Sequence, residues 1–261
     1  MSKKITNVLI VFFGIVFLFS CVMIVRENVQ RNKEISDFKA IADIVNNTVA
    51  IDATDSSDTD SFVTDEPDSS SDTELTPVFK RNLKPIFEMN SDCIGWICIE
   101  GTTVDYPVMF APSEPQKYLR KNFEGKYSLS GTPFLQENST LDCDNIVIYG
   151  HNMKNGTMFS DITAYVDRSY YEQHPVIEFE TARGLVTYEV ISVMQVKNND
   201  PWYAFINAVD EADYMARVSA AMNDSIYPIE SEVSHERQIL TLSTCYGKNK
   251  DDRLIVIAAE Q

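Results

Sequence analysis

The sequence predicts a mainly β fold, in which eight short strands form a closed or nearly closed barrel with peripheral helices. Short apolar runs, separated by Gly, Pro and Asn, fill the chain from about Pro77 onward, and few helical patterns interrupt them. Such runs are typical of barrels. A third observation concerns the N-terminal end, where 21 uncharged residues from Ile5 to Val25 precede the β-rich part. This run has the length of a membrane helix.

The run from Ile5 to Val25 would extend roughly 31 Å as a helix, at about 1.5 Å per residue, against a bilayer core of about 30 Å. We expect an uncleaved transmembrane anchor (5–25) after a short cytoplasmic N-terminus (1–4), because the hydrophobicity continues beyond any small-residue cleavage site. A cleaved signal peptide and a lipoprotein-type site at Cys21 are the alternatives. Basic residues flank both ends, so the positive-inside rule does not fix the orientation.

The next two segments differ in composition. Residues 26–49 predict a juxtamembrane helix, because apolar residues between Arg31 and Val45 recur at helical spacing. Residues 50–77 hold nine acidic residues and no Lys or Arg, and few apolar ones. They predict an acidic flexible linker. The formal net charge of −17 argues against a protein that binds nucleic acid through a basic surface.

The folded domain is expected at 78–261. Its expected strands are Ile94–Ile99, Thr103–Val108, Thr132–Leu135, Asn145–Tyr149, Val176–Glu180, Leu185–Val196, Gln238–Thr244 and Arg253–Ala259. Two helices are expected, Val78–Met89 and Asp210–Met222, the latter between the sixth and seventh strands. Asp210 is placed to cap the second helix. One face of that helix is expected to carry Ala212, Met215, Val218 and Met222.

The cysteines do not resemble a metal site. There are five, an odd number, and Cys21 falls in the expected membrane segment. No C-x-x-C and no Cys/His cluster at zinc spacing is present, so we expect neither a metal nor a cofactor. Cys93, Cys98 and Cys143 lie in or beside apolar strands and are expected to be small buried hydrophobic residues. A disulfide among these three stays open.

Cys245 has a different setting. It ends the run QILTLST, and a polar turn of seven residues separates it from Arg253. Two strands so joined are expected to form an antiparallel hairpin, which would place Cys245 opposite Arg253 at one rim of the barrel. A guanidinium there would favour a thiolate and stabilise an oxyanion. The alternative is that Arg253 pairs with Asp251 or Asp252 on the surface.

A thiol nucleophile usually needs an imidazole, and the chain has three His. His151 directly follows the strand NIVIYG, so it is expected at a strand end. His174 precedes Pro175 in a loop, and His235 lies in a polar segment before the seventh strand. Position at a barrel rim favours His151.

These residues resemble the signature of the sortases, cysteine transpeptidases of Gram-positive bacteria. The resemblance rests on TLSTC (Thr241–Cys245), on the Arg eight residues later, and on NIVIYGHNM (Asn145–Met153). Three further segments resemble class B members: CIGWICIEGTTVDYPVM (Cys93–Met109), GTPFL (Gly131–Leu135) and NGTMFSDI (Asn155–Ile162). The helix before the cysteine strand also resembles class B. The resemblance covers roughly residues 78–261.

The resemblance implies a sortase-type barrel and a role for each matching residue. Cys245 would attack the carbonyl of a Thr in the C-terminal sorting motif of a surface protein and form a thioester. His151 would protonate the leaving amine and deprotonate the incoming one. Arg253 would hold the substrate backbone and the oxyanion, with the backbone N–H of Tyr246 as a second donor. The substrate groove would be lined by Ser243, Thr244, Tyr149 and Leu119.

The resemblance also implies partners and location. The acceptor would be an amine of the peptidoglycan precursor, and the enzyme would be a single-pass protein of the cell membrane with its catalytic domain outside. In one substrate-contacting stretch, class B relatives often have an Asn four residues before the Leu of a Tyr-Leu pair; here Pro115 precedes Tyr118-Leu119. Three alternatives stay open: a pilin-polymerising sortase, a plain thiol protease, and an inactive surface-displayed binding module.

Overall fold

The computed structural model describes residues 3–47 and 77–261. The chain divides into two compact units, Met1–Ala40 and Ile41–Gln261. The expected acidic linker lies outside the described residues, apart from Pro77.

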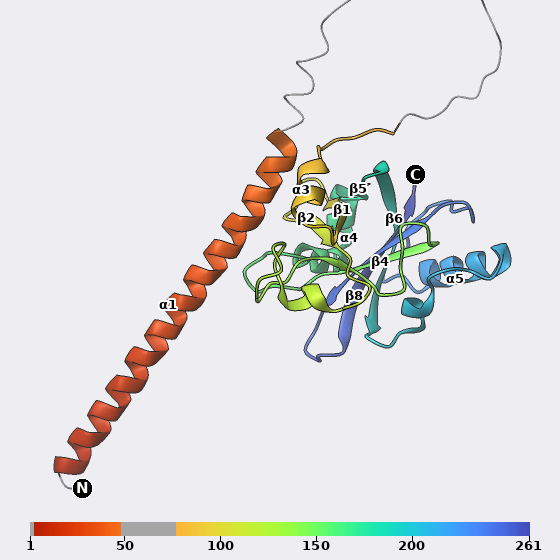
Figure 1. Ribbon diagram of the computed structural model, residues 1–261. Helices are drawn as coiled ribbons and strands as arrows, with labels where there is room; N and C mark the ends of the chain where they lie inside the picture. Colours follow the sequence, from red (N-terminus) through yellow and green to blue (C-terminus); the bar gives the residue numbers. More distant parts are fainter. Residues whose placement is uncertain (1–2, 48–76) are drawn as a thin grey trace, which may run out of the picture. The chain divides into compact units, whose positions relative to one another are not determined.

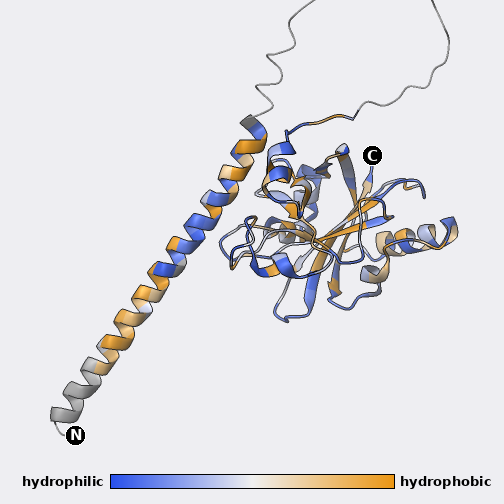
Figure 2. Ribbon diagram, in the orientation of Figure 1, coloured by the Kyte–Doolittle hydropathy of each residue, from blue (hydrophilic) through white to orange (hydrophobic). Residues whose placement is uncertain are grey.

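The first described element is one continuous helix, α1 (Lys3–Asn47). The sequence analysis treated its apolar part and the juxtamembrane part as two elements, whereas the helix runs through both. Its large apolar side chains are exposed from Phe12 to Val25, and Phe12, Phe13 and Phe17 each expose more than half of their surface, whereas Phe38, Ile41 and Val45 near its C-terminal end are buried. Length and composition alone make Phe12–Asn46 a candidate membrane span. Figure 2 shows a long stretch of hydrophobic residues in α1 beyond the grey turns at its N-terminal end.

The second unit contains a closed barrel of eight strands (Figure 1). They are β1 (Cys93–Cys98), β2 (Asp105–Met109), β3 (Phe134–Leu135), β4 (Asn145–Tyr149), β5 (Val176–Thr181), β6 (Gly184–Lys197), β7 (Ile239–Cys245) and β8 (Asp252–Glu260). Their order around the barrel is β1-β2-β3-β4-β7-β8-β6-β5. The pairs β2/β3 and β4/β7 are parallel, and the other pairs are antiparallel.

The expected eight-stranded barrel is confirmed, and the strand ends lie within two residues of those expected. The second strand begins at Asp105 rather than at Thr103 because Thr102 forms a turn before it. The Thr102 hydroxyl donates to the Ile99 carbonyl (2.8 Å) and accepts from the Val104 N–H (3.0 Å). The turn therefore uses the backbone groups that a longer strand would need.

The expected helix Val78–Met89 is wrong in its first half. The helix α3 covers only Lys84–Met89, and Pro85 occupies its first turn. Proline suits that position, since its ring fixes φ and its missing N–H would have no helical partner there. The residues before it bond to the barrel instead: the Val78 carbonyl accepts from Leu185 N–H (2.8 Å).

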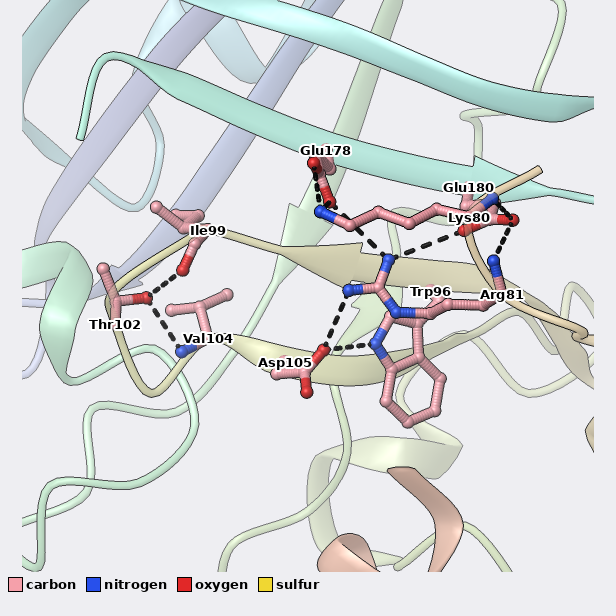
Figure 3. Close-up of polar contacts among 9 residues, drawn as sticks. All are labelled: Lys80, Arg81, Trp96, Ile99, Thr102, Val104, Asp105, Glu178 and Glu180. Carbon is pink, nitrogen blue, oxygen red and sulfur yellow. Dashed lines mark hydrogen bonds and ion pairs between the residues drawn. The ribbon is translucent and has the colours of Figure 1, made fainter. Parts of the chain in front are cut away.

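A charged cluster fastens this preceding segment to β5 (Figure 3). The backbone N–H groups of Lys80 and Arg81 both donate to one carboxylate oxygen of Glu180, each at 2.9 Å. The Arg81 guanidinium lies among the carboxylates of Glu180 (3.5 Å), Glu178 (3.6 Å) and Asp105 (3.5 Å). Its side chain is 6% exposed and that of Glu180 is 0% exposed. Residues 80–81 are thus bound to the barrel through buried charge.

The helix α5 (Glu211–Asn223) lies between β6 and β7 in the chain, as expected. Asp210 caps it, because its carboxylate accepts the Asp213 N–H at 2.9 Å. Of the expected apolar face, Val218 is buried and Met215 and Met222 pack partly buried against the core, whereas Ala212 is exposed. Tyr214 and Ala221 are buried as well, and the Tyr214 ring packs with Phe205 of the β6–α5 connection.

The other described helices are short, and the sequence analysis did not anticipate them. They are the 3-10 helices η1 (Lys117–Arg120), η2 (Asp161–Val166) and η3 (Pro201–Ala204) and the helix α4 (Arg168–Gln173).

Candidate active site

The parallel pairing of β4 with β7 brings the two expected reactive residues to one end of the barrel. The register runs from Asn145 opposite Ile239 to Tyr149 opposite Ser243. Because the strands are parallel, the residues that follow Tyr149 and Ser243 leave the sheet at the same end. His151 therefore follows one strand where Cys245 ends the other.

Hydrogen bonds continue this register beyond the sheet. Gly150 N–H donates to the Ser243 carbonyl (3.1 Å), and the Thr244 hydroxyl donates to the Gly150 carbonyl (2.8 Å). The side-chain amide of Asn152 then donates to the Cys245 carbonyl (3.0 Å). The residues on both sides of His151 are thus tied to the strand that carries Cys245.

Cys245 and Arg253 are paired directly across the β7–β8 hairpin, which confirms the expected register. Cys245 is exposed to solvent. The Arg253 guanidinium donates through Nη1 to the backbone carbonyls of Lys250 (2.7 Å) and Asp252 (2.9 Å). The Asp252 carboxylate instead forms an ion pair with Lys197. Among the described residues, Nε and Nη2 of Arg253 form no hydrogen bond, so they are free to bind a substrate oxygen.

His151 is half-buried, and its ring is oriented by a backbone group. Nε2 lies 2.9 Å from the Leu119 carbonyl. Burial lowers the pKa of His151 below its ordinary value, and the positive charge of Arg120 acts in the same direction. The Leu119 carbonyl opposes them, because it stabilises the protonated ring. The neutral imidazole is therefore the dominant form at neutral pH.

A pocket of about 470 Å³ joins these three residues. Cys245, His151 and Arg253 all line this pocket. So do four of the residues expected to line the groove: Tyr149, Ser243, Thr244 and Leu119. Ser243 and Thr244 are almost fully buried, at 1% and 2% exposure. Their hydroxyl groups already bond to Tyr203 and Gly150. They consequently stiffen the pocket wall more than they offer free hydrogen-bonding groups.

The structure places Tyr246 differently from the sequence analysis. Its backbone N–H donates to the Asp252 carbonyl at 3.1 Å within the β7–β8 turn. Tyr246 is also absent from the residues that line the pocket. In this conformation its N–H is therefore not available as the expected second oxyanion donor.

Several residues that line the pocket were not expected from the sequence, among them Tyr203 and Gln136. Tyr203, in η3, shares a hydrogen bond of 2.8 Å with Ser243, and Gln136 accepts the Tyr149 hydroxyl at 2.7 Å. Gln136 also donates to the Tyr203 carbonyl (2.9 Å), so the wall is one connected network. Burial raises the pKa of Tyr203 to about 12, which keeps its hydroxyl protonated. Gln136 was detectable as the polar residue that follows GTPFL, but no local pattern marks Tyr203.

The other histidines and cysteines do not line the pocket. His174 bonds through Nδ1 to the Glu100 carbonyl (2.8 Å), and His235 lies 3.3 Å from the Glu211 carboxylate. All five cysteines are free. Burial raises the pKa of Cys93 to about 12 and that of Cys98 to about 11, so both stay neutral thiols. The described residues contain no group of three or more His, Cys, Asp or Glu that could hold a metal ion.

Comparisons with known proteins agree with this geometry. Residues 97–261 match the family model described as Sortase domain. The chain is 34% identical over 173 residues to Sortase B of Listeria monocytogenes, covering 64% of this chain and 68% of that protein. It is 28% identical over 187 residues to Sortase B of Staphylococcus aureus, covering 69% and 76%. A structure described as a Staphylococcus aureus sortase B-substrate complex superimposes with a TM-score of 0.73, at 22% identity, over 89% of this chain and 98% of that one.

Proposed function

The chain belongs to the sortase family, within the sortase B group, and is a sortase-type cysteine transpeptidase; from this premise we propose that Cys245, His151 and Arg253 are its catalytic residues. The observation that carries the proposal is their convergence on one pocket. Cys245 and Arg253 are cross-strand partners, and the parallel β4–β7 register brings His151 to the same end of the barrel.

In the first half-reaction, the Cys245 thiolate attacks a peptide carbonyl of the substrate. The carbon–nitrogen bond of that peptide breaks, a thioester forms, and His151 in its protonated form gives a proton to the leaving amine. Arg253 stabilises the oxyanion of the tetrahedral intermediate with the donors that the hairpin carbonyls do not use.

In the second half-reaction, a primary amine attacks the thioester carbon. His151, now neutral, takes the proton from that amine, and the carbon–sulfur bond breaks to release the Cys245 thiolate. The lowered pKa of His151 favours the neutral ring, which is the form that can accept this proton. One residue can serve both halves because the proton that it gives in the first is regained in the second.

Sortases act on substrates that carry a sorting motif, and we place this enzyme's chemistry after a Thr in the C-terminal motif of surface proteins. The acceptor is an amine of the peptidoglycan precursor. The candidate span in α1 supports a single-pass membrane protein, and the proposed peptidoglycan acceptor requires that the barrel lie outside the cell. A C-terminal epitope tag that external protease removes from intact cells would support this orientation, and a protected tag would contradict it.

The test uses the full chain in detergent micelles with a panel of Thr-containing sorting peptides, with and without triglycine as amine. Mass spectrometry reads the products. We expect cleavage after Thr and a triglycine adduct, both lost in Cys245→Ala and both kept in Cys98→Ala, which removes a half-buried thiol that does not line the pocket. Retained turnover in Cys245→Ala would refute the assignment of the nucleophile.

Two other reactions give different products in the same test. Hydrolysis that added amine does not divert would indicate a thiol protease. A peptide with a Lys side-chain amine that outcompetes triglycine would indicate a pilin-polymerising sortase.

A further inference from the structure

One ring nitrogen of His151 is already committed in this structure. Nε2 lies 2.9 Å from the Leu119 carbonyl oxygen. A carbonyl can only accept a hydrogen bond, so Nε2 must carry a proton in the neutral ring as well as in the charged ring. The lone pair of the neutral ring then resides on Nδ1. Nδ1 is consequently the nitrogen that takes up and releases a proton.

The peptide groups on both sides of Leu119 are themselves held. Leu119 lies in η1, and the carbonyl before it, that of Tyr118, accepts the Thr132 N–H at 3.0 Å. The carbonyl after it, that of Arg120, accepts the Ser128 N–H, also at 3.0 Å. The direction of the Leu119 carbonyl is thus fixed by backbone contacts on each side.

The Tyr118 side chain also holds this turn in place. It is 1% exposed, and its hydroxyl donates to the Asp92 carboxylate at 2.9 Å. The side-chain amide of Asn90 donates to that hydroxyl at 3.0 Å. Asp92 also forms an ion pair with Lys117 at 2.6 Å. The turn that presents the Leu119 carbonyl is therefore rigid.

Gly131 packs directly against this carbonyl. Its φ is +62°, a conformation that favours glycine. A Cβ at position 131 would lie 2.6 Å from the Tyr118 oxygen and 2.7 Å from the Leu119 oxygen. Both contacts are with backbone atoms, so no side-chain rotation relieves them. Any side chain at this position must displace the group that orients His151.

These contacts lead to an inference that rests on the proposed role of His151. We propose that the Leu119 carbonyl is the positioning group of His151, kept in place by the absence of a side chain at Gly131, and that it reserves Nδ1 for the protons exchanged with the two amines. The charge of Arg120, on the same turn as Leu119, acts on the ring, and the charged and titratable residues that line the same pocket are Cys245, Arg253, Glu137, Tyr149 and Tyr203.

The first test needs no variant that perturbs the fold. Side-chain ¹⁵N NMR of the full chain in micelles, with labelled histidine, reads the tautomer of each ring; the chain has three His, and His151→Gln identifies the relevant signal. We expect the Nε2–H tautomer for His151 above its pKa. A dominant Nδ1–H tautomer would overturn the proposal.

The second test compares Gly131→Ala with Gly125→Ala. Both positions have a positive φ, +62° and +77°, but a Cβ at Gly125 would meet nothing within 4 Å. Gly125→Ala therefore reproduces the backbone strain without the clash. We expect Gly131→Ala to lower the pKa of His151 further, because the carbonyl stabilises the imidazolium. Its kcat should fall by about a hundredfold with little change in KM, while Gly125→Ala keeps both.

An unchanged His151 tautomer, pKa and kcat in Gly131→Ala would refute the proposal, as would equal effects of the two substitutions. If Gly131→Ala does not fold, Tyr118→Phe, which removes the anchor of the turn, must lower the pKa of His151 in the same direction, and no change would refute it. Failure of the proposed function can be distinguished from failure of this inference. Wild-type kcat in His151→Gln would remove the acid–base role, whereas the NMR tautomer is read without turnover.

Discussion

Removal of Arg81 should destabilise the barrel more than removal of any exposed charge, because its partners would stay buried. In Arg81→Met, the Glu180 carboxylate would lose its cationic partner while its side chain stays at 0% exposure. Glu178 would retain Lys80, which lies 2.7 Å away. The Glu180 carboxylate would retain only the two backbone N–H groups at 2.9 Å. Figure 3 shows that the guanidinium is the group facing all three carboxylates.

The magnitude follows from this geometry. Loss of one partner from a buried ion pair costs about 3–5 kcal/mol. The contacts of the Arg81 guanidinium with carboxylates are 3.5–3.6 Å, longer than ordinary hydrogen bonds. We therefore expect the lower end, about 3 kcal/mol of unfolding free energy. For a unit of this size that corresponds to a decrease in Tm of roughly 6–12 °C.

Equilibrium urea unfolding, followed by tryptophan fluorescence, measures this loss. The chain has two Trp, and Trp96 is fully buried beside the cluster, with its indole N–H donating to Asp105 at 2.6 Å. The matched control is Lys80→Met. The Lys80 side chain is 46% exposed, so its ion pair should contribute no more than about 1 kcal/mol.

A double substitution identifies the cause. In Arg81→Met/Glu180→Gln the buried charge is gone, and the amide oxygen of Gln can still accept the two backbone N–H groups. We expect this variant to be more stable than Arg81→Met alone. If Arg81→Met lies within 1 kcal/mol of the wild type, or if the double variant is the less stable of the two, the uncompensated-charge argument is wrong.

Three further outcomes are expected. The folded-state pKa of His151 is below its ordinary value of 6.5, so the neutral ring contributes folding stability that is lost as pH falls through 6.5 and below. In urea unfolding, His151→Gln should therefore lose less unfolding free energy between pH 7 and 5 than the wild type does. An equal loss in the two proteins would contradict this. Gly150→Ala should cost about 1–3 kcal/mol in the same assay, since the added Cβ would lie 2.4 Å from the fully buried Phe159 ring; unaltered stability would mean that the ring can move. Asn152→Ala removes an exposed hydrogen bond to the Cys245 carbonyl. The free energy of unfolding should change by no more than about 1 kcal/mol, while kcat/KM falls up to about tenfold. Unchanged kinetics would show that the contact does not position the nucleophile.

Local patterns predicted much of this site. The register of Cys245 with Arg253 followed from the length of a polar turn, because a hairpin confines its two ends to neighbouring positions. The strand ends followed from runs of apolar residues. The extended segment before α3 was not predicted, because the spacing of its apolar residues suits a helix. There the carboxylate of Glu180, 100 residues away from Lys80, takes the backbone N–H groups.

The pairing that completes the site is of another kind. His151 and Cys245 are 94 residues apart, and they meet because β4 and β7 are parallel neighbours. Parallel strands need a crossover, so no turn between them fixes their register. The register is set instead by buried hydrogen bonds such as that of Thr241 with Asn145. The same reasoning explains why Leu119 could be expected in the groove but not as the acceptor for His151. That contact belongs to the backbone, and its geometry depends on Gly131, whose lack of a side chain leaves no hydrophobic pattern to read.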